Sequence, residues 1–252
     1  MRTMLAFLLG FLPFACASAE GQAVPPSSAP APAPAPAPSG GAEGPLVVEL
    51  FTSQGCNSCP PADRHLATMA KAGQVSGRAV VPLSFHVDYW NDLGWTDPYS
   101  QAAWTERQQT YARALGDRVY TPELVVGGAA GMVGSHTQKI AAAIAAAPRP
   151  ALLAATAAWA TDHVEVTATA PADADVLVAV WEDARTIAVP RGENAGEKLT
   201  NHRIVRRLER IAAAGQRGTK RIALDPGWKG TGAVAFAQRA DQRIIASALL
   251  PR

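Results

Sequence analysis

The chain has 252 residues, of which 48% are hydrophobic, so it is long enough for one large domain or two small ones with real cores. Its formal net charge is only +2, and both signs are interspersed along the chain. Proteins that bind nucleic acids usually carry a basic stripe, so this composition argues against such a partner. After the amino-terminal segment no apolar stretch is long enough to span a membrane, so we expect none in the mature chain.

Residues 1–19 have the pattern of a signal peptide. Arg2 supplies the positive start, and the apolar run 4–14 is too short for an ordinary membrane anchor. Small residues follow it, and they favour cleavage after Ala19. We therefore expect a periplasmic or secreted protein. Cys16 offers a lipoprotein alternative, but the residues before it fit that pattern poorly.

Residues 20–44 are rich in alanine and proline. The Ala-Pro repeat lacks an amide donor at every second position and has no side chains that would build a core. It predicts a semi-extended, polyproline-like linker that acts as a tether without a specific partner.

The first ordered elements flank a pair of cysteines. Residues 46–51 form an apolar run of strand length, and Cys56-Asn57-Ser58-Cys59 follows a short break. The next two prolines suit the first turn of a helix, where a missing N–H costs little. That helix should run to about residue 72 and end at Gly73, and residues 78–85 predict a second strand.

The next segment predicts two more helices and two more strands. Asp97-Pro98 predicts a helix start, and Gly116 ends that helix. Strands are expected at 123–126 and 131–134, and Ser135 caps a last helix that reaches about residue 147. The order strand, helix, strand, helix, strand, strand, helix is that of a thioredoxin-like core. We therefore predict an α/β domain over residues 45–150.

Residues 151–252 have the character of a β-rich module. Polar and apolar residues alternate over 163–170, and further apolar runs of strand length follow, separated by turns. These runs cover residues 176–181, 220–224, 233–238 and 244–249. The pattern predicts a small sandwich-like fold, and periodicity does not separate helix from strand over 204–214.

Cys56 and Cys59 carry the predicted chemistry. Export removes Cys16, and a ring of four residues constrains the unfolded chain little, so reactivity explains the pair better than stabilisation. At a helix start, the backbone N–H groups stabilise a thiolate and lower the pKa of Cys56. We expect an exposed Cys56 to attack and Cys59 to resolve the mixed disulfide. A CxxC pair is also half of a zinc site, but no second pair completes it.

Three further positions extend the predicted site. Thr121-Pro122 precedes a core strand, where a cis bond would expose the backbone of Thr121 for pairing with an extended substrate. Glu49 precedes the cysteines on the first strand, as a proton shuttle for the resolving cysteine or as a solvated edge residue.

Polar and aromatic residues follow the second strand. His86, Asp88, Tyr89 and Trp90 lie where strand ends face the active site of such sheets, so they are candidates for a substrate groove. His86 is also a candidate metal ligand together with the cysteines. A histidine that is simply a satisfied polar residue is the plainer interpretation.

Five long segments resemble, in order, a family of exported bacterial proteins catalogued as domain of unknown function 1223. They are ELFTSQGCNSCPPAD (49–63), FHVDYWNDLGWTDP (85–98), ERQQTYARALG (106–116), VYTPELVVGG (119–128) and RGENAGEKLTNHRIVR (191–206). The resemblance covers about residues 46–252 and implies a thioredoxin-like fold and export, without an established activity. The family often has Ser where this chain has Asn57. The segment 191–206 predicts only a polar, turn-rich surface.

The leading functional hypothesis is a thiol–disulfide oxidoreductase. Its substrates would be exported proteins or small thiols, it would need no cofactor, and its redox partner is unknown. Asn57-Ser58 lacks both the His of strong oxidants and the Gly-Pro of strong reductants, which predicts an intermediate potential. One alternative is a copper- or zinc-binding chaperone that uses Cys56, Cys59 and His86. Another is a non-catalytic interaction protein in which the β-rich half does the work.

Overall fold

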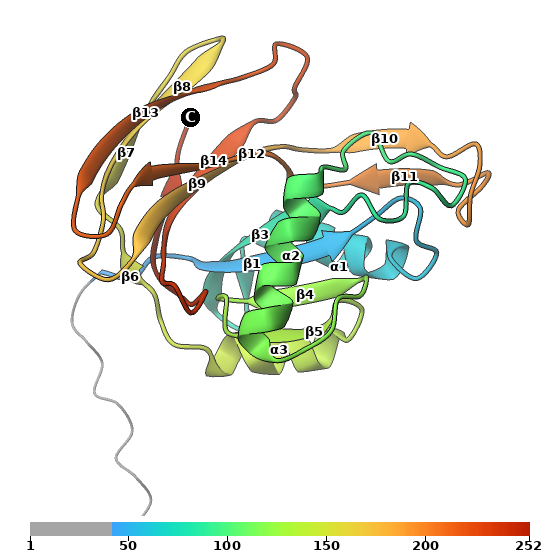
Figure 1. Cartoon of the computed structure of the whole chain (residues 1–252), viewed down its shortest axis with the longest axis horizontal. Helices are drawn as coiled ribbons and strands as arrows, with labels where there is room; N and C mark the ends of the chain where they lie inside the picture. The colour runs from blue at the N-terminus through green and yellow to red at the C-terminus, as the bar shows by residue number, and fades with distance from the viewer. Residues whose placement is uncertain (1–41) are drawn as a thin grey trace, which may run out of the picture. The chain divides into compact units, whose positions relative to one another are not determined.

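The computed structural model describes residues 42–252. The predicted signal peptide and residues 20–41 of the predicted linker lie outside the described residues. The described residues belong to one compact unit that contains a large mixed sheet, two small antiparallel sheets and helices (Figure 1). None of the helices in this part of the chain is long and apolar enough to cross a membrane.

The elements follow one another from Leu46 to Leu250. The helices are α1 (Pro60–Ala72), α2 (Ala102–Leu115) and α3 (Thr137–Ala146). The strands are β1 (Leu46–Thr52), β2 (Gln74–Val75), β3 (Arg78–His86), β4 (Glu123–Val126), β5 (Ala130–Val133), β6 (Ala151–Leu152), β7 (Ala155–Trp159), β8 (His163–Thr169), β9 (Asp175–Glu182), β10 (Arg185–Ala188), β11 (Lys198–Asn201), β12 (Ile204–Ala212), β13 (Arg217–Ala223), β14 (Gly232–Gln238) and β15 (Ile244–Leu250).

The large sheet runs through both halves of the described chain. Its strand order is β5-β4-β1-β3-β12-β9-β14-β15-β6, and β2 pairs separately with β3. β1 and β3 are parallel, β4 is antiparallel to β1, and β12 is parallel to β3. At the junction Ile204 lies opposite Ser84, whose N–H donates to the C=O of Arg203 (2.8 Å). The predicted boundary at residue 150 therefore separates two parts whose strands share one sheet.

Alternation along β1 explains the layers on this sheet. Leu46, Val48 and Leu50 pack with the apolar residues of α1 and α3. Val47 and Phe51 point to the other face, where α2 lies. Figure 1 shows α2 in front of the sheet and α1 and α3 behind it. Further along the sheet, the three strands β13-β8-β7 pack against β9 and β14 around a second apolar core.

Most helix and strand predictions over residues 46–252 are confirmed. α1 spans 60–72, with prolines in its first turn and Gly73 as its left-handed cap (φ 63°). α2 likewise ends at Gly116 (φ 66°). Glycine suits both positions because it lacks the Cβ that disfavours positive φ. The undecided segment 204–214 contains the strand β12.

The predicted helix start at Asp97-Pro98 is wrong, since α2 begins at Ala102. Asp97 caps a separate turn, in which it accepts the N–H of Tyr99 (2.9 Å) through its side chain and that of Ser100 (3.1 Å) through its backbone. Its other carboxylate oxygen accepts the N–H of Gln54 (2.8 Å). A capping residue followed by proline therefore indicates a turn. Here the turn places the Asp97 side chain against Gln54 and does not start a helix.

A buried ion pair connects β1, α2 and β14. Arg107 on α2 donates to both carboxylate oxygens of Glu49 on β1 (2.6 and 2.8 Å). Tyr111 donates its hydroxyl to Glu49 (2.6 Å), and Gln238 of β14 contacts both Arg107 and Tyr111. Because every charge is paired and hydrogen-bonded, the cost of burying this pair is offset only while all partners remain.

Substituting Arg107→Met should lower the free energy of unfolding by about 3–5 kcal/mol, because Glu49 would then be a buried charge without a cation. Urea denaturation at neutral pH measures this change. The double variant Glu49→Gln with Arg107→Met removes both charges and should recover part of the loss. A loss below about 1 kcal/mol in the single variant would contradict the assignment.

Candidate functional site

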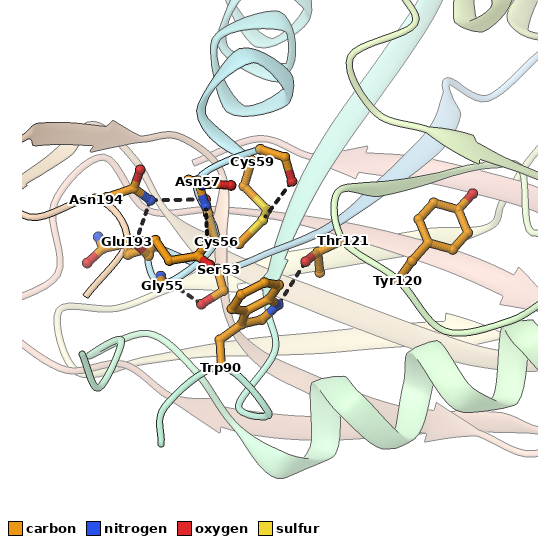
Figure 2. The surroundings of a disulfide bond; sticks show 12 residues. Ser53, Gly55, Cys56, Asn57, Cys59, Trp90, Tyr120, Thr121, Glu193 and Asn194 are labelled. Atoms are coloured by element: carbon orange, nitrogen blue, oxygen red, sulfur yellow. Dashed lines mark hydrogen bonds between the residues drawn. A yellow bond between two sulfur atoms is a disulfide. The ribbon is translucent and has the colours of Figure 1, made fainter. Parts of the chain in front are cut away.

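A disulfide joins Cys56 and Cys59 where the chain passes from β1 into α1 (Figure 2). The two Cα atoms are 5.5 Å apart. Cys59 is the residue before the first helical turn, and its C=O accepts the N–H groups of Ala62 (2.9 Å) and Asp63 (3.1 Å). Pro60 starts the helix at a position where no N–H is needed. The local sequence thus builds the bend that brings the cysteines together.

Both cysteines are fully buried, with 0% of each exposed. The expectation of an exposed Cys56 is therefore wrong. The intervening residues Asn57 and Ser58 are the exposed part of the loop, and the Ser58 hydroxyl lies 3.3 Å from the sulfur of Cys56. Cys56 is next to this exposed tip, and segments from elsewhere in the chain that pack on the loop bury it.

Three of the predicted site residues lie around the disulfide. Trp90 packs on Gly55, where a Cβ atom would be 3.1 Å from that of Trp90. The indole N–H of Trp90 donates to the Thr121 hydroxyl (2.8 Å), as Figure 2 shows. The Thr121–Pro122 bond is cis, so this prediction is confirmed. Pro122 is buried, and its C=O accepts the N–H of Gly134 (2.9 Å).

His86 belongs to a buried polar cluster. It is 0% exposed, and its Nδ1 lies 2.7 Å from Asp97. Asp97 also accepts the N–H of Gln54 in the loop between β1 and α1 (residues 53–59), which we call the cysteine loop. Burial lowers the pKa of His86, but the charge and hydrogen bond of Asp97 outweigh it, so the net shift is upward. Within the described residues, no three Cys, His, Asp or Glu side chains are placed to hold a metal ion.

Two predicted residues make their contacts elsewhere. Glu49 lies on the face of β1 that packs against α2, opposite the face that packs against α1, and its hydrogen bonds go to Arg107 and Tyr111. Asp88 accepts the hydroxyl of Thr105 (2.5 Å) and so ties its loop to α2. Neither side chain has a hydrogen bond with the cysteine loop.

Asp63 is an acidic residue of this region that the sequence interpretation missed. It lies one turn after Cys59 on the buried face of α1. Burial raises its pKa to about 6, although the nearby His86 opposes the shift. A carboxyl group of this pKa exchanges its proton near neutral pH, as a proton acceptor for Cys59 would need to. The sequence spacing could have indicated Asp63, because Cys59 and Asp63 are four residues apart and such residues share one face of a helix.

The segment 191–206, predicted as a polar surface, lies partly over the cysteine loop. Asn194 is buried and donates to the C=O groups of Gln54 (2.8 Å) and Cys56 (3.0 Å). Asn201 accepts the side-chain amide of Gln54 (2.8 Å). Glu193 accepts the N–H of Asn57 (3.0 Å). Sequence spacing gave no signal for these contacts, because they join residues more than 130 positions apart.

The raised pKa of Asp63 predicts a pH dependence of stability. The unfolded carboxyl ionises near 3.8 and the folded one near 6, so the folded state binds more protons between these values. The free energy of unfolding should therefore fall as pH rises through this window, by on the order of 2–3 kcal/mol. Asp63→Asn should abolish this part of the fall in urea denaturation curves.

Glu123→Gln provides the matched comparison. Burial raises the pKa of Glu123 from 4.5 to about 7, so this residue contributes a fall of the same sign at higher pH. The two variants should flatten different parts of the profile. An Asp63→Asn profile that runs parallel to the wild-type profile from about pH 4 to 6 would contradict the assignment.

Comparisons with known proteins give the family of this chain. No curated protein matches it. A crystal structure of protein AGR_C_4864 from Agrobacterium tumefaciens is similar, with 32% identity, a TM-score of 0.65, and coverage of 82% of this chain and 95% of that one. HBP35 of Porphyromonas gingivalis shares the fold at 16% identity, with a TM-score of 0.55 and coverage of 82% and 75%. The family model described as "Protein of unknown function (DUF1223)" matches residues 47–238, so the chain belongs to this family.

Proposed function

We propose that this chain is an exported, thioredoxin-like thiol–disulfide oxidoreductase whose reactive pair is Cys56 and Cys59. The disulfide between these residues at the start of α1 is the observation that carries the proposal. A ring closed across two intervening residues removes little entropy from the unfolded chain, so its value to the protein is chemical. Exported proteins and small thiols are the proposed substrates.

The arrangement around the pair supports the thioredoxin-like part of the proposal. β1, α1 and β3 form a parallel strand–helix–strand unit, and α2, β4, β5 and α3 follow in the expected order. The cis Thr121–Pro122 bond precedes β4, and Trp90 connects Thr121 to the cysteine loop. The amino-terminal signal pattern supports export.

The proposed chemistry uses the position of each cysteine relative to the helix. The positive end of the α1 dipole favours negative charge on Cys56, which makes it the attacking or attacked sulfur, although the N–H groups of Ala62 and Asp63 in the first turn are themselves bonded to the C=O of Cys59. When a substrate thiol reduces the disulfide, Cys59 leaves as a thiolate. In the reverse direction, Cys59 attacks the mixed disulfide and closes the ring again. Asp63, one turn further on, is the proposed group that exchanges a proton with Cys59.

Equilibration in glutathione buffers tests the proposal. The pair should interconvert between dithiol and disulfide at a potential between about −120 and −300 mV, the span of known thiol enzymes. Free thiols are quantified after acid quenching and alkylation. Cys59→Ser should trap a mixed disulfide with glutathione at Cys56, and Cys56→Ser should trap far less.

The absence of any reversible disulfide in this range would refute the redox proposal. Cysteine-dependent uptake of copper or zinc by the reduced protein, in a pair that never forms such a disulfide, would instead support the metal-binding alternative. A cellular phenotype that Cys56→Ser leaves unchanged would support the interaction-protein alternative.

A further inference from the structure

The turn between β10 and β11 lies on the cysteine loop, although it comes from the distant half of the chain. Gly192 is packed so closely that a Cβ atom there would lie 3.1 Å from the Cβ of Trp95. The next two residues are Glu193 and Asn194, which hold the loop through the hydrogen bonds described above. Figure 2 shows both side chains next to Cys56 and Asn57.

The two side chains do different things to the loop. Asn194 is buried and holds two backbone carbonyl groups, including that of Cys56, so it fixes the loop in a conformation in which both sulfurs are inaccessible. Glu193 is exposed, and its carboxylate occupies the N–H of Asn57, the residue directly after Cys56. A negative charge therefore lies beside the exposed tip of the loop.

Two charged side chains hydrogen-bond to this loop among the described contacts, and Glu193 is the exposed one. The other charged one is Asp97, which is buried and paired with His86. Arg191, Glu197 and Lys198 lie close to the turn in sequence and are exposed, but none of their side chains hydrogen-bonds to the loop among the described contacts. A thiol that approaches Cys56 thus comes close to an anion that faces the solvent.

We propose that the turn Gly192–Asn194 determines which thiols react with the disulfide: Glu193 disfavours anionic thiols relative to cationic ones, and Asn194 limits access for all of them. This inference rests on the proposed thiol–disulfide exchange at Cys56 and Cys59. The preferred substrate thiols are therefore neutral or lie within a positively charged surface.

The exchange itself takes two thiols. The first, as a thiolate, attacks the Cys56 sulfur, forms a mixed disulfide and breaks the Cys56–Cys59 bond, and Cys59 leaves as a thiolate that takes up a proton. The second thiolate attacks the substrate sulfur of the mixed disulfide and releases Cys56 as a thiolate. Two substrate thiols are oxidised to one disulfide while the protein gains two electrons. Glu193 acts on the first step, in which the incoming charge approaches the loop.

Rates of reduction by three small thiols test the proposal. Glutathione, 2-mercaptoethanol and cysteamine carry net negative, zero and positive charge outside the sulfur. Each rate constant is expressed per thiolate and divided by that of the same thiol with a small neutral disulfide, which removes differences in ionised fraction and in nucleophilicity. In the wild-type protein, cysteamine should react fastest and glutathione slowest. Glu193→Gln should raise the rate of glutathione relative to cysteamine by about threefold, and salt at about 1 M should shrink the wild-type difference.

Two further variants separate charge from access. Glu165→Gln removes an exposed carboxylate from β8 in the separate three-stranded sheet and should leave the ratio of rates unchanged. Asn194→Ala should speed all three thiols by a similar factor, because it removes two hydrogen bonds that close the loop. Circular dichroism and urea denaturation confirm that each variant is folded.

The outcomes distinguish this inference from the proposed function. If the disulfide is reduced but the ratio for Glu193→Gln equals that of the wild type, the inference is refuted and the redox proposal stands. A disulfide that no thiol reduces, in the wild type or in Asn194→Ala, would refute both.

Discussion

The parallel pairing of β12 with β3 is the constraint on which the site depends. Ile204, the first residue of β12, lies opposite Ser84 near the carboxyl end of β3. The chain that leads into β12 contains Asn194 and Asn201, whose side chains hydrogen-bond to Gln54 in the loop that leaves β1. This part of the chain includes the antiparallel pair β10 and β11 and the turn between them. The second half of the chain thus contributes Glu193 and Asn194 to the candidate site, as Figure 2 shows.

Burial of polar groups gives this region its particular chemistry. The N–H of Gln54 and the Nδ1 of His86 meet the carboxylate of Asp97 in the protein interior, whereas the buried Nε2 of His86 has no hydrogen-bond partner among the described residues. Unpaired polar groups in such a place would cost several kcal/mol, about as much as many domains have in total stability. The cluster therefore fixes the position of the loop before Cys56. Asp63 is buried in the same region, and burial raises the pKa of its carboxyl group to about 6 although His86 opposes the shift.

The burial of the disulfide bears on the proposed redox function. Thiol–disulfide exchange requires an attacking sulfur to reach one of the cysteines in line with the bond. In this protein the loop is held by Asn194 from one side and packs on Trp90 from another. Under the proposed function, the rate of exchange depends on how readily these contacts break as well as on the thiol chemistry. The charged and polar residues of the turn after β10 are in a position to discriminate between reaction partners.

Local sequence signals are sufficient to predict the structure around the cysteines. Two prolines after Cys59 and glycines at 73 and 116 set helix boundaries that depend on a few neighbouring residues, and the cis bond before Pro122 followed from its place in the element order. Apolar runs of strand length also identified most strands, and alternation identified the one over 163–170, since burial needs no knowledge of the partner strand. The family resemblance pointed to the same cysteine pair.

The side chains that surround that pair are brought there by long-range contacts, which local signals do not predict. Glu49 was a reasonable candidate by spacing, but the parity of β1 turns it toward α2 and its ion pair with Arg107. The burial of Cys56 and the contacts of Glu193 and Asn194 depend on strand pairing between residues more than one hundred positions apart. Local propensity carries no information about such pairings, because each strand is compatible with several neighbours until the whole sheet is assembled.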